Sequence, residues 1–561
     1  MEFMLIPEVK KLTVLPGFLE KKEIAISGSI EDVRLSHALL KLPQAEQGTP
    51  VQIKLTGEEG EGYRLKISTN AIAIEAGSAA GAFYAIQTLR QLYKMNDIPC
   101  LEIEDKPDFP YRGFYHDVTR GQIPKVETIK KLIDDMAYYK LNSLQLYVEH
   151  VFPFKETQGL MESCGYLTGQ ELREIGDYCR ENFIDFIPSL STFGHMYDTL
   201  EQPQYRHLRV LKDYEAEPNF WHARMAHHTI NPLQEESLSL VKSMIDQYMP
   251  HFDSEWFNIC CDETFDLKTL EGQDVGKVYV EFVQKIIDHV RGSGKKVMMW
   301  ADILLQHPEV IELLPEETMF LNWYYNPIPD QMTEKVSRFA QSGRKQIVCP
   351  GTWTWHRLCE NVADEECNIV GMIDEGWKNG AVGVLNTNWG DWGNPCSLAL
   401  GMYGMVLGAA KSWNVTTNPG DSFYHKVNAL LYGSSWGMMT LIKLSKLHDA
   451  ISWQAIADHH FCGEDSKYVL PSRQTLEKVQ QEYLDFSWKV SSNEPWEQDD
   501  YRQEMILAAG GVCALAQKAA KLGGFEVSQY VDTEEWLKQY RSAWLEKNKE
   551  SELRNIEPLF S

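Results

Sequence analysis

The chain has 561 residues, of which 43% are hydrophobic, and a net charge of −26. This length exceeds what one hydrophobic core usually organises, so we expect more than one domain. The strong negative charge argues against nucleic acid or an anionic membrane as the main partner. The first residues lack the uninterrupted apolar core of a signal peptide, and no stretch approaches the roughly 18 apolar residues of a membrane span. We therefore expect a cytoplasmic protein.

The 11 cysteines are scattered along the chain without a Cys-x-x-Cys pair. This spacing predicts neither a zinc site nor a disulfide framework, and it is compatible with a reducing compartment.

Residues 1–107 have the pattern of a small α+β domain. Apolar residues alternate over 63–67 and again over 72–74, and the intervening turn residues predict a β-hairpin. Segment 81–93 has helical spacing and is expected to cover one face of the sheet. Pro107 marks the exit from this domain.

From residue 108 to residue 415, strand-like and helix-like segments alternate. The predicted strands are 112–118, 143–148, 184–190 and 256–263, followed by four that begin near Val297, Met319, Ile347 and Ala381. Amphipathic helices are predicted between them, and a long loop follows the third strand. Eight strand–helix units predict a (β/α)₈ TIM barrel as the catalytic domain. A doubly wound open sheet is the alternative, but the chain lacks its glycine-rich phosphate loop.

Residues 416–561 are predicted to form a helical C-terminal domain, with helices near 474–488, 500–522 and 533–548. No catalytic motif is visible there. We interpret this part as a packing or oligomerisation domain, and a homodimer is left open.

In a TIM barrel the chemistry lies at the C-terminal ends of the strands. In this chain those ends carry mainly carboxylates and indoles: Arg120, Glu149 with His150, His195, Asp262 with Glu263, Trp300 with Asp302, Trp323, Trp353, and Trp389 with Asp391. Indoles pack against the apolar faces of sugars, and carboxylates bind hydroxyls or move protons. The set therefore favours a carbohydrate substrate.

Asp262 and Glu263 end the apolar run that begins at Trp256. Two like charges this close disfavour joint ionisation, so one carboxyl is expected to have a raised pKa. That is the property of a general acid that works near neutral pH. The alternative is a helix-capping Asp beside a solvated Glu.

These motifs, in this order, resemble glycoside hydrolase family 20, the β-N-acetylhexosaminidases, over roughly residues 60–413. The resemblance rests on Arg112-Gly113 with Arg120, Gly194-His195, Asp262-Glu263 and Trp389-Gly390-Asp391. It looks closest to a bacterial branch that acts on terminal β-N-acetylglucosamine. It implies an oligosaccharide substrate and no cofactor or metal.

The resemblance also implies roles. Glu263 is similar to the family's general acid/base, and Asp262 to the residue that orients the substrate's 2-acetamido group. In this family the acetamido oxygen itself is the nucleophile. The expected reaction is therefore a retaining, exo-acting hydrolysis through an oxazolinium intermediate, with N-acetylglucosamine and N-acetylgalactosamine both open as the released sugar. Both acids can reach one pocket only if Glu263 lies where the chain turns past the strand end.

The remaining residues are similar to the family's sugar-binding groups. Arg120 matches an arginine on the 3- and 4-hydroxyls, and Asp391 a glutamate on the 4- and 6-hydroxyls. Trp300, Trp323 and Trp389 match the tryptophans around the acetamido methyl and the ring. His195 matches a histidine paired with an acid, here Glu149. A structural ion pair for Arg120 and a buried core histidine are the alternatives.

One departure concerns the seventh strand. The family has a tyrosine there that binds the acetamido oxygen, whereas this chain has 351–355, with Trp353 at its centre. The indole N–H, Tyr324 or Tyr325 are the candidates for that contact. Three histidines in the long third loop, His222, His227 and His228, suggest a metal less than a loop near the rim.

Two other functions are compatible with the sequence. One is a conventional two-carboxylate glycosidase on the same barrel, with Glu149, Asp302 or Asp391 as the partner of Glu263. The other is a carbohydrate-binding homologue without catalysis.

Overall fold

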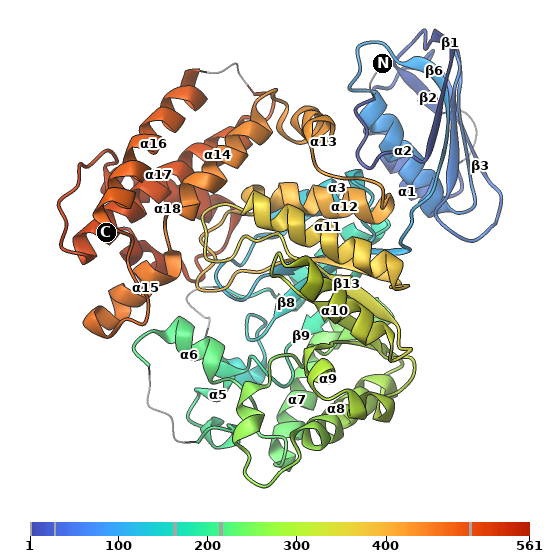
Figure 1. The fold of residues 1–561 in the computed structure, drawn as a ribbon. Helices are drawn as coiled ribbons and strands as arrows, with labels where there is room; N and C mark the ends of the chain where they lie inside the picture. Colours follow the sequence, from blue (N-terminus) through green and yellow to red (C-terminus); the bar gives the residue numbers. More distant parts are fainter. Residues whose placement is uncertain (1–2, 27–29, 161–164, 213–216, 493–495) are drawn as a thin grey trace.

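The computed structural model describes residues 3–26, 30–160, 165–212, 217–492 and 496–561. Three parts follow one another along the chain: a sheet-containing N-terminal part, a central barrel and a helical C-terminal part (Figure 1). The fold class is therefore the one expected.

The N-terminal part is a six-stranded sheet in the order β1-β6-β4-β5-β3-β2. Its strands are β1 (Lys11–Phe18), β2 (Ile24–Ile26), β3 (Thr49–Leu55), β4 (Tyr63–Ile67), β5 (Ile72–Ala76) and β6 (Pro99–Asp105). The predicted hairpin is confirmed as β4 paired antiparallel with β5. Two helices, not one, accompany the sheet: α1 (Val33–Leu39) and α2 (Ala79–Leu92). Both lie on the side that faces the barrel (Figure 1), so α2 is buried almost throughout.

Eight parallel strands close into the central barrel in the order β7 to β14, with β14 pairing with β7. They are β7 (Tyr111–Asp117), β8 (Ser143–Val148), β9 (Asp185–Leu190), β10 (Trp256–Asn258), β11 (Lys296–Trp300), β12 (Met319–Trp323), β13 (Gln346–Cys349) and β14 (Gly383–Asn388). Their interior is filled by a buried cluster that includes Tyr115, Tyr147, Cys260 and Trp300. The barrel is thus a packed core, and a site can form only at its ends.

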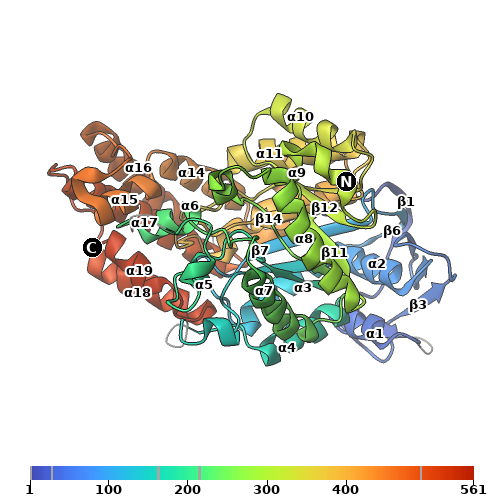
Figure 2. The same ribbon diagram turned by 90° about the horizontal axis from the view of Figure 1, so that it is seen from below.

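Helices surround the barrel: α3 (Val126–Tyr138), α4 (Gly169–Glu181), α7 (Glu235–Tyr248), α8 (Val275–Gly292), α9 (Asp302–Gln306), α10 (Pro329–Ala340), α11 (Val362–Lys378) and α12 (Met402–Trp413). Helix α4 begins with a capping box between Thr168 and Glu171, as an S/T-x-x-E pattern predicts. The segment predicted as a long loop after β9 contains two short helices, α5 (Tyr197–Leu200) and α6 (Phe220–Ala226). It reaches toward the C-terminal helices (Figure 2).

The C-terminal part comprises α13 (Asp421–Val427), α14 (Gly437–Asp449), α15 (Trp453–Cys462), α16 (Arg473–Ser492), α17 (Asp499–Leu522), α18 (Thr533–Lys547) and α19 (Leu553–Ile556). Helix α17 is long and apolar enough to cross a membrane by length and composition, but 72% of its most apolar window is buried in the protein. It packs against α14, α15, α16 and α18. We therefore describe α17 as the core helix of this part.

Candidate active site

The two adjacent acids lie just beyond β10, which is shorter than predicted. The strand ends at Asn258, whereas the sequence pattern predicted it through Glu263. The reason is a turn of the backbone: Cys260, Cys261 and Glu263 have φ of 56°, 66° and 48°. Such values are sparsely populated for residues with a Cβ and are common at functional sites. This turn meets the condition stated above for both acids to reach one cavity.

Gly194 is required where the loop after β9 passes this turn. A Cβ at Gly194 would lie 2.3 Å from the carbonyl oxygen of Asp262. The close approach of the two backbones places the next residue, His195, against the acids. The Nε2 atom of His195 lies 3.4 Å from Oδ2 of Asp262 and 3.3 Å from Oε2 of Glu263.

The neighbours of His195 act on its pKa in opposite directions. Burial alone would lower its pKa, but the Asp262 carboxylate and hydrogen bonds to both acids raise the pKa of His195 to about 10. His228 stacks on it with ring centroids 4.4 Å apart, and Nδ1 of His228 accepts the backbone N–H of His195 at 2.9 Å. Burial and the charge of His195 hold the pKa of His228 well below its usual value, so its Nδ1 stays an acceptor. His228 is thus a support of the site rather than a metal ligand.

A third acid, Asp302, lies behind the pair at the start of α9. Its Oδ2 accepts the backbone N–H of Glu263 at 3.1 Å. Burial and the neighbouring charge of Asp262 raise the pKa of Asp302 to about 7. Asp302 therefore holds the turn that presents Glu263 and is itself close to titration at neutral pH.

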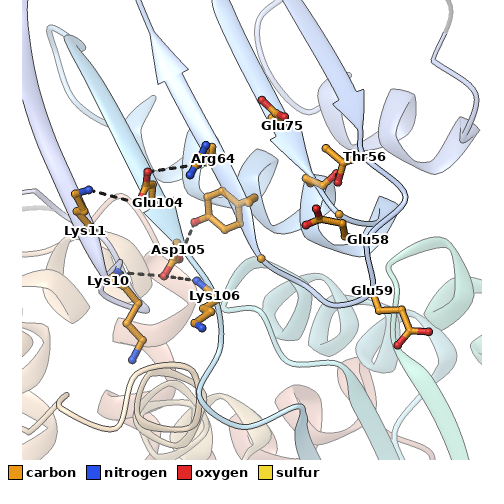
Figure 3. Close-up of a pocket in the computed structure, with 14 residues that line it drawn as sticks. Lys10, Lys11, Thr56, Glu58, Glu59, Arg64, Glu75, Glu104, Asp105 and Lys106 are labelled. Carbon is orange, nitrogen blue, oxygen red and sulfur yellow. Dashed lines mark hydrogen bonds and ion pairs between the residues drawn. The ribbon is translucent and has the colours of Figure 1, made fainter.

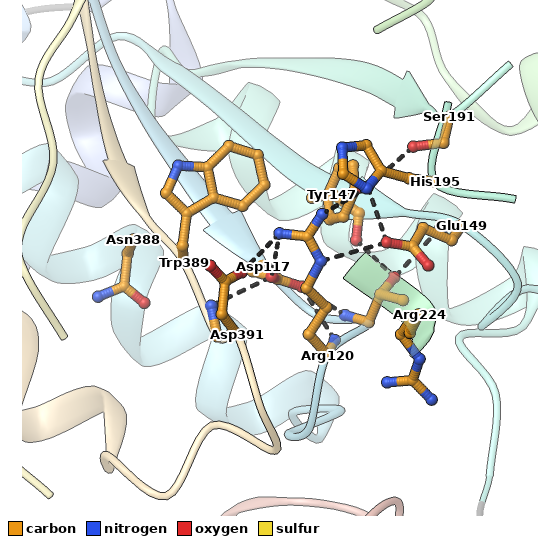
Figure 4. A network of polar contacts seen from close by, with 12 residues as sticks. Asp117, Arg120, Tyr147, Glu149, Ser191, His195, Arg224, Asn388, Trp389 and Asp391 are labelled. Carbon is orange, nitrogen blue, oxygen red and sulfur yellow. Dashed lines mark hydrogen bonds and ion pairs between the residues drawn. The ribbon is translucent and has the colours of Figure 1, made fainter. Parts of the chain in front are cut away.

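Arg120 is the centre of a polar network that includes His195 (Figure 4). Its Nη1 lies 2.7 Å from Oδ1 of Asp391, its Nε lies 3.3 Å from Oε1 of Glu149, and its Nη2 lies 3.1 Å from Nδ1 of His195. The guanidinium also lies over the rings of Tyr147 and Trp389, 4.8 and 5.1 Å from their centroids. A guanidinium with its donors held this way presents a fixed edge to adjacent hydroxyls.

Asp117, at the end of β7, holds the two loops that carry Arg120 and Asp391. Its Oδ1 accepts the backbone N–H groups of Thr119 and Arg120 at 2.9 and 3.1 Å, and its Oδ2 accepts that of Gly390 at 3.1 Å. The sequence analysis missed Asp117, although an acid at a strand end before a turn is a signal for such a role.

These groups surround a cavity of about 220 Å³. Most of the predicted site residues line it: Arg120, His195, Asp262, Glu263, Trp323, Trp353, Trp389 and Asp391. Tyr325, a candidate for the acetamido contact, lines it too, as do Met225, Asn326 and Trp355, to which the sequence analysis gave no role. The indoles and Tyr325 form one aromatic wall, with Tyr325 stacked on Trp323 at 5.1 Å.

Two predicted residues do not line the cavity. Trp300 is completely buried inside the barrel, where it packs against Tyr115 and Trp389. Glu149 is 4% exposed and contacts the back of Arg120 rather than the cavity. The structure places both behind residues that line the cavity, because a strand-end residue can point into the barrel or behind its neighbours, and their contact with substrate stays a prediction. Both support residues that do line the cavity.

Tyr325, Trp353 and Tyr324 are the three candidates for the acetamido contact, and the structure separates their surroundings. The indole N–H of Trp389 donates to the Tyr325 hydroxyl at 2.7 Å, which leaves the hydroxyl's own hydrogen to be donated. The indole N–H of Trp353 is already used by the Tyr325 carbonyl at 3.0 Å. Tyr324 points elsewhere, since its hydroxyl donates to Gln331. Of the three candidates in the sequence, Tyr325 has a side chain that lines the cavity, and its hydroxyl is also within hydrogen-bonding reach of Thr387.

One group of side chains within the described ranges has the spacing of metal ligands. Glu149, His150 and Asp198 each place a ligand atom within 4.8 Å of the others. Arginines already occupy this region: Nε of Arg224 lies 2.9 Å from Oδ2 of Asp198, and Nε of Arg120 lies 3.3 Å from Oε1 of Glu149. Two guanidinium groups repel a metal cation, so we assign no metal to this group.

A larger hollow of about 550 Å³ lies on the N-terminal sheet (Figure 3). Its charged side chains pair with one another: Glu104 lies 3.4 Å from Lys11 and 3.3 Å from Arg64. Because these pairs are exposed and no group is held ready for proton transfer, the barrel cavity is the better candidate for catalysis.

Comparisons with known proteins agree with this placement. Residues 109–378 match the family model described as "Glycosyl hydrolase family 20, catalytic domain", and residues 4–106 match "Glycosyl hydrolase family 20, domain 2". The chain belongs to glycoside hydrolase family 20.

Individual relatives are similar over parts of the chain. A beta-hexosaminidase of Akkermansia muciniphila is 34% identical over 160 residues, which is 24% of this chain and 32% of that protein. The structure of Flavobacterium johnsoniae chitobiase superimposes with a TM-score of 0.63 at 17% identity, over 100% of this chain and 99% of that one. A mutant Streptomyces plicatus beta-hexosaminidase in complex with its product GlcNAc superimposes with a TM-score of 0.61 at 19% identity, over 77% and 94% of the two chains. The structural likenesses establish the fold.

Family 20 membership accounts for the order of the site residues along the chain. Both family models lie N-terminal to residue 379, so the loop that carries Trp389 and Asp391 and the helices from α12 onward lie outside them.

Proposed function

We propose that this chain is a retaining exo-β-N-acetylhexosaminidase that releases terminal β-linked N-acetylglucosamine. The observation that carries the proposal is that Asp262 and Glu263, though adjacent in sequence, open into the same indole-lined cavity and flank His195. The Streptomyces plicatus relative, which has the same fold, binds GlcNAc as its product.

The cavity fits one terminal sugar. Its volume of about 220 Å³ is below the ~300 Å³ at which pockets for drug-sized ligands begin. Trp323, Trp353 and Trp389 line it and supply apolar surface to the sugar ring. Arg120 and Asp391, held together at 2.7 Å, supply donor and acceptor groups to the hydroxyls on the opposite side. A cavity of this size favours removal of a chain end over cleavage within a chain.

The two acids differ in exposure, and this difference matches two roles. The side chain of Glu263 is 24% exposed and that of Asp262 is 9% exposed. The more exposed Glu263 is positioned to donate its proton to the leaving glycosidic oxygen and afterwards to take one from water. The deeper Asp262 is positioned to accept the acetamido N–H and to stabilise the positive charge of the oxazolinium ion.

In this mechanism the acetamido oxygen attacks the anomeric carbon. The bond from that carbon to the glycosidic oxygen of the leaving group breaks as Glu263 protonates the glycosidic oxygen. Water then opens the oxazolinium ring at the anomeric carbon, with Glu263 removing its proton. Two displacements at one carbon retain its configuration. We assign the Tyr325 hydroxyl as the donor that holds the acetamido oxygen, because Tyr325 lines the cavity and its hydroxyl can turn its hydrogen toward a bound substrate.

A conventional two-carboxylate mechanism is less well supported. It needs a nucleophilic carboxylate facing Glu263 across the bond. Asp302 is occupied by the Glu263 backbone N–H, Asp391 is paired with Arg120, and Glu149 lies behind Arg120.

Release of p-nitrophenol from its β-N-acetylglucosaminide tests the proposal directly. The protein is expected to release it, and proton NMR should show the β-anomer of N-acetylglucosamine as the first product. The corresponding galactosaminide, assayed in parallel, measures the preference at the 4-hydroxyl. Absence of cleavage with retained binding of N-acetylglucosamine would identify a non-catalytic binding protein instead.

A further inference from the structure

The C-terminal tail reaches the active-site rim at Ser551-Glu552. The Ser551 hydroxyl donates to the carbonyl oxygen of Gly121, the residue that follows Arg120. A Cβ at Gly121 would lie 2.1 Å from the carbonyl oxygen of Gly393, so the tail touches the point where the loops after β7 and β14 meet. These loops carry Arg120 and Asp391.

Glu552 also binds the helix on the other side of the rim. Its Oε2 accepts the indole N–H of Trp221 at 2.8 Å, and its Oε1 accepts a hydrogen bond from Nη1 of Arg224 at 2.6 Å. Both partners are on α6, whose Met225 lines the cavity. The side chains of Glu552 and Arg224 are each 8% exposed, so their charges are weakly screened by water.

From Arg224 a line of ionisable side chains leads to Arg120. Nε of Arg224 lies 2.9 Å from Oδ2 of Asp198, and Nδ1 of His150 lies 3.5 Å from that same oxygen. The same Nδ1 lies 3.9 Å from Oε2 of Glu149, whose other oxygen lies 3.3 Å from Nε of Arg120. Glu149, His150 and Arg224 are buried, and Figure 4 shows Arg224 beside Glu149 and Arg120.

We propose that Glu552 is a positioning residue for sugar binding, acting through Arg224, Asp198, His150 and Glu149 on the guanidinium of Arg120. The C-terminal helical part then contributes to the substrate site although none of its residues lines the cavity within the described chain. This inference rests on the proposed function, because it assigns Arg120 to the substrate hydroxyls.

Arg120 carries one positive charge but has three carboxylates around it. Asp117, Glu149 and Asp391 all lie within 3.8 Å of its nitrogens. Glu149 also lies 3.9 Å from Nδ1 of His150, and Asp198 lies 2.9 Å from Nε of Arg224. Removing the Glu552 charge frees Arg224 to pair more fully with Asp198. This pairing weakens the attraction of Asp198 for His150. The position of Glu149 then shifts relative to Arg120. An arginine that moves by a fraction of an ångström loses its paired contact with two hydroxyls.

The test is the isosteric variant Glu552→Gln, which keeps an acceptor for Trp221 but removes the charge. Because a hydroxyl contact is made in both the ground state and the transition state, KM is expected to rise several-fold while kcat stays close to that of the wild type. The matched control is Glu504→Gln. Glu504 has the same 8% exposure and pairs with Lys547 within the helical part, away from the rim. This control is expected to lower Tm without changing KM.

Two further measurements distinguish positioning from simple loss of stability. On a 4-deoxy substrate, which lacks one of the two hydroxyls assigned to Arg120, Glu552→Gln should raise KM by a smaller factor than on the parent substrate. Asp198→Asn changes the same line of contacts at a residue outside the C-terminal tail. In the double variant, the effects of Asp198→Asn and Glu552→Gln on KM should therefore not be additive. Asp198→Asn alone carries the test if Glu552→Gln does not fold.

The inference is overturned if Glu552→Gln lowers Tm but leaves KM and the Kd for N-acetylglucosamine unchanged, or if its effects are the same on the deoxy substrate. A wild-type protein that binds N-acetylglucosamine without cleaving the glycoside contradicts the proposed function alone, and Kd then replaces KM in every comparison. A wild-type protein that neither binds nor cleaves contradicts both.

Discussion

The carboxylate of Asp302 accepts the backbone N–H of Glu263 at 3.1 Å. Glu263 has a φ of 48°, a conformation that costs free energy for a residue with a Cβ. The hydrogen bond comes from the next unit of the barrel, since Asp302 begins α9 after β11. The hydrogen bond to Asp302 thus stabilises the turn that carries Glu263 beyond the end of the strand. This turn allows the adjacent acids Asp262 and Glu263 to line one cavity.

The pKa of Asp302 predicts a pH-dependent contribution to stability. Its pKa is raised from 3.8 to about 7 in the folded protein. The unfolded chain therefore loses this proton at lower pH than the folded protein, and stability falls as the pH rises from about 4 to 7. Asp302→Asn, which cannot ionise, should gain Tm relative to the wild type across this window. Thermal melts at pH 4.5 and pH 8 measure it, and an unchanged or shrinking difference contradicts the assignment.

Glu263→Gln should lower kcat by about 10²–10⁴-fold, since general acid–base catalysis contributes roughly that much. Binding of N-acetylglucosamine should remain close to normal because the amide keeps the side chain's shape. Steady-state kinetics and calorimetry measure the two effects. The control is Glu271→Gln, because Glu271 is an exposed glutamate that follows Glu263 in the chain. This variant should behave as wild type.

Asp262→Asn should be nearly as damaging despite its similar size. A neutral amide cannot balance the positive charge of an oxazolinium ion, and losing one stabilising group of this kind typically costs about 10²–10³ in kcat. The loss should appear on acetamido substrates in kcat more than in KM. Full activity of Asp262→Asn would show that Asp262 does not act on the intermediate.

Tyr325→Phe removes the hydroxyl that we assign to the acetamido oxygen. Its expected effect is a loss of kcat on the order of 10²-fold, because misplacing an attacking atom by about 1 Å costs about that much. Tyr324→Phe is the matched control, because the neighbouring ring is similar in size and its hydroxyl contacts Gln331 outside the cavity. Equal effects of the two substitutions would contradict the assignment.

The barrel was predictable from sequence because its determinants are local. Each strand is a short apolar run before a helix with an apolar face, and the ends of eight such runs must meet at one rim. That reasoning alone brought Arg120, Asp262 and Asp391 together, although they are far apart in the chain. The prediction did not depend on any single motif.

Other parts of the site depend on tertiary contacts that leave no periodic signal. The turn at Glu263 follows two cysteines with positive φ. Cysteine is not a residue type that predicts this backbone conformation. The burial of Trp300 depends on which way a strand-end residue points. The sequence alone cannot distinguish Tyr324 from Tyr325 as the candidate for the acetamido contact. In the structure, the hydrogen bond from Trp389 distinguishes Tyr325.

The role of the C-terminal tail was the furthest from prediction. Glu552 contacts Trp221 across 331 positions of sequence. A single acidic residue in a polar, helical segment has the pattern of a solvated surface charge. Its burial follows from the packing of the tail against α6, which the segment's own sequence does not indicate.

The central claim is that the substrate's own acetamido oxygen is the nucleophile. It is tested most directly by kcat/KM for aryl glycosides whose acetyl group carries zero, one, two or three fluorines. Fluorine withdraws electrons from the carbonyl oxygen and weakens its attack while changing the shape of the group little. The account predicts a steep fall in kcat/KM with each added fluorine. A rate independent of fluorination would show that an enzyme carboxylate attacks the sugar instead.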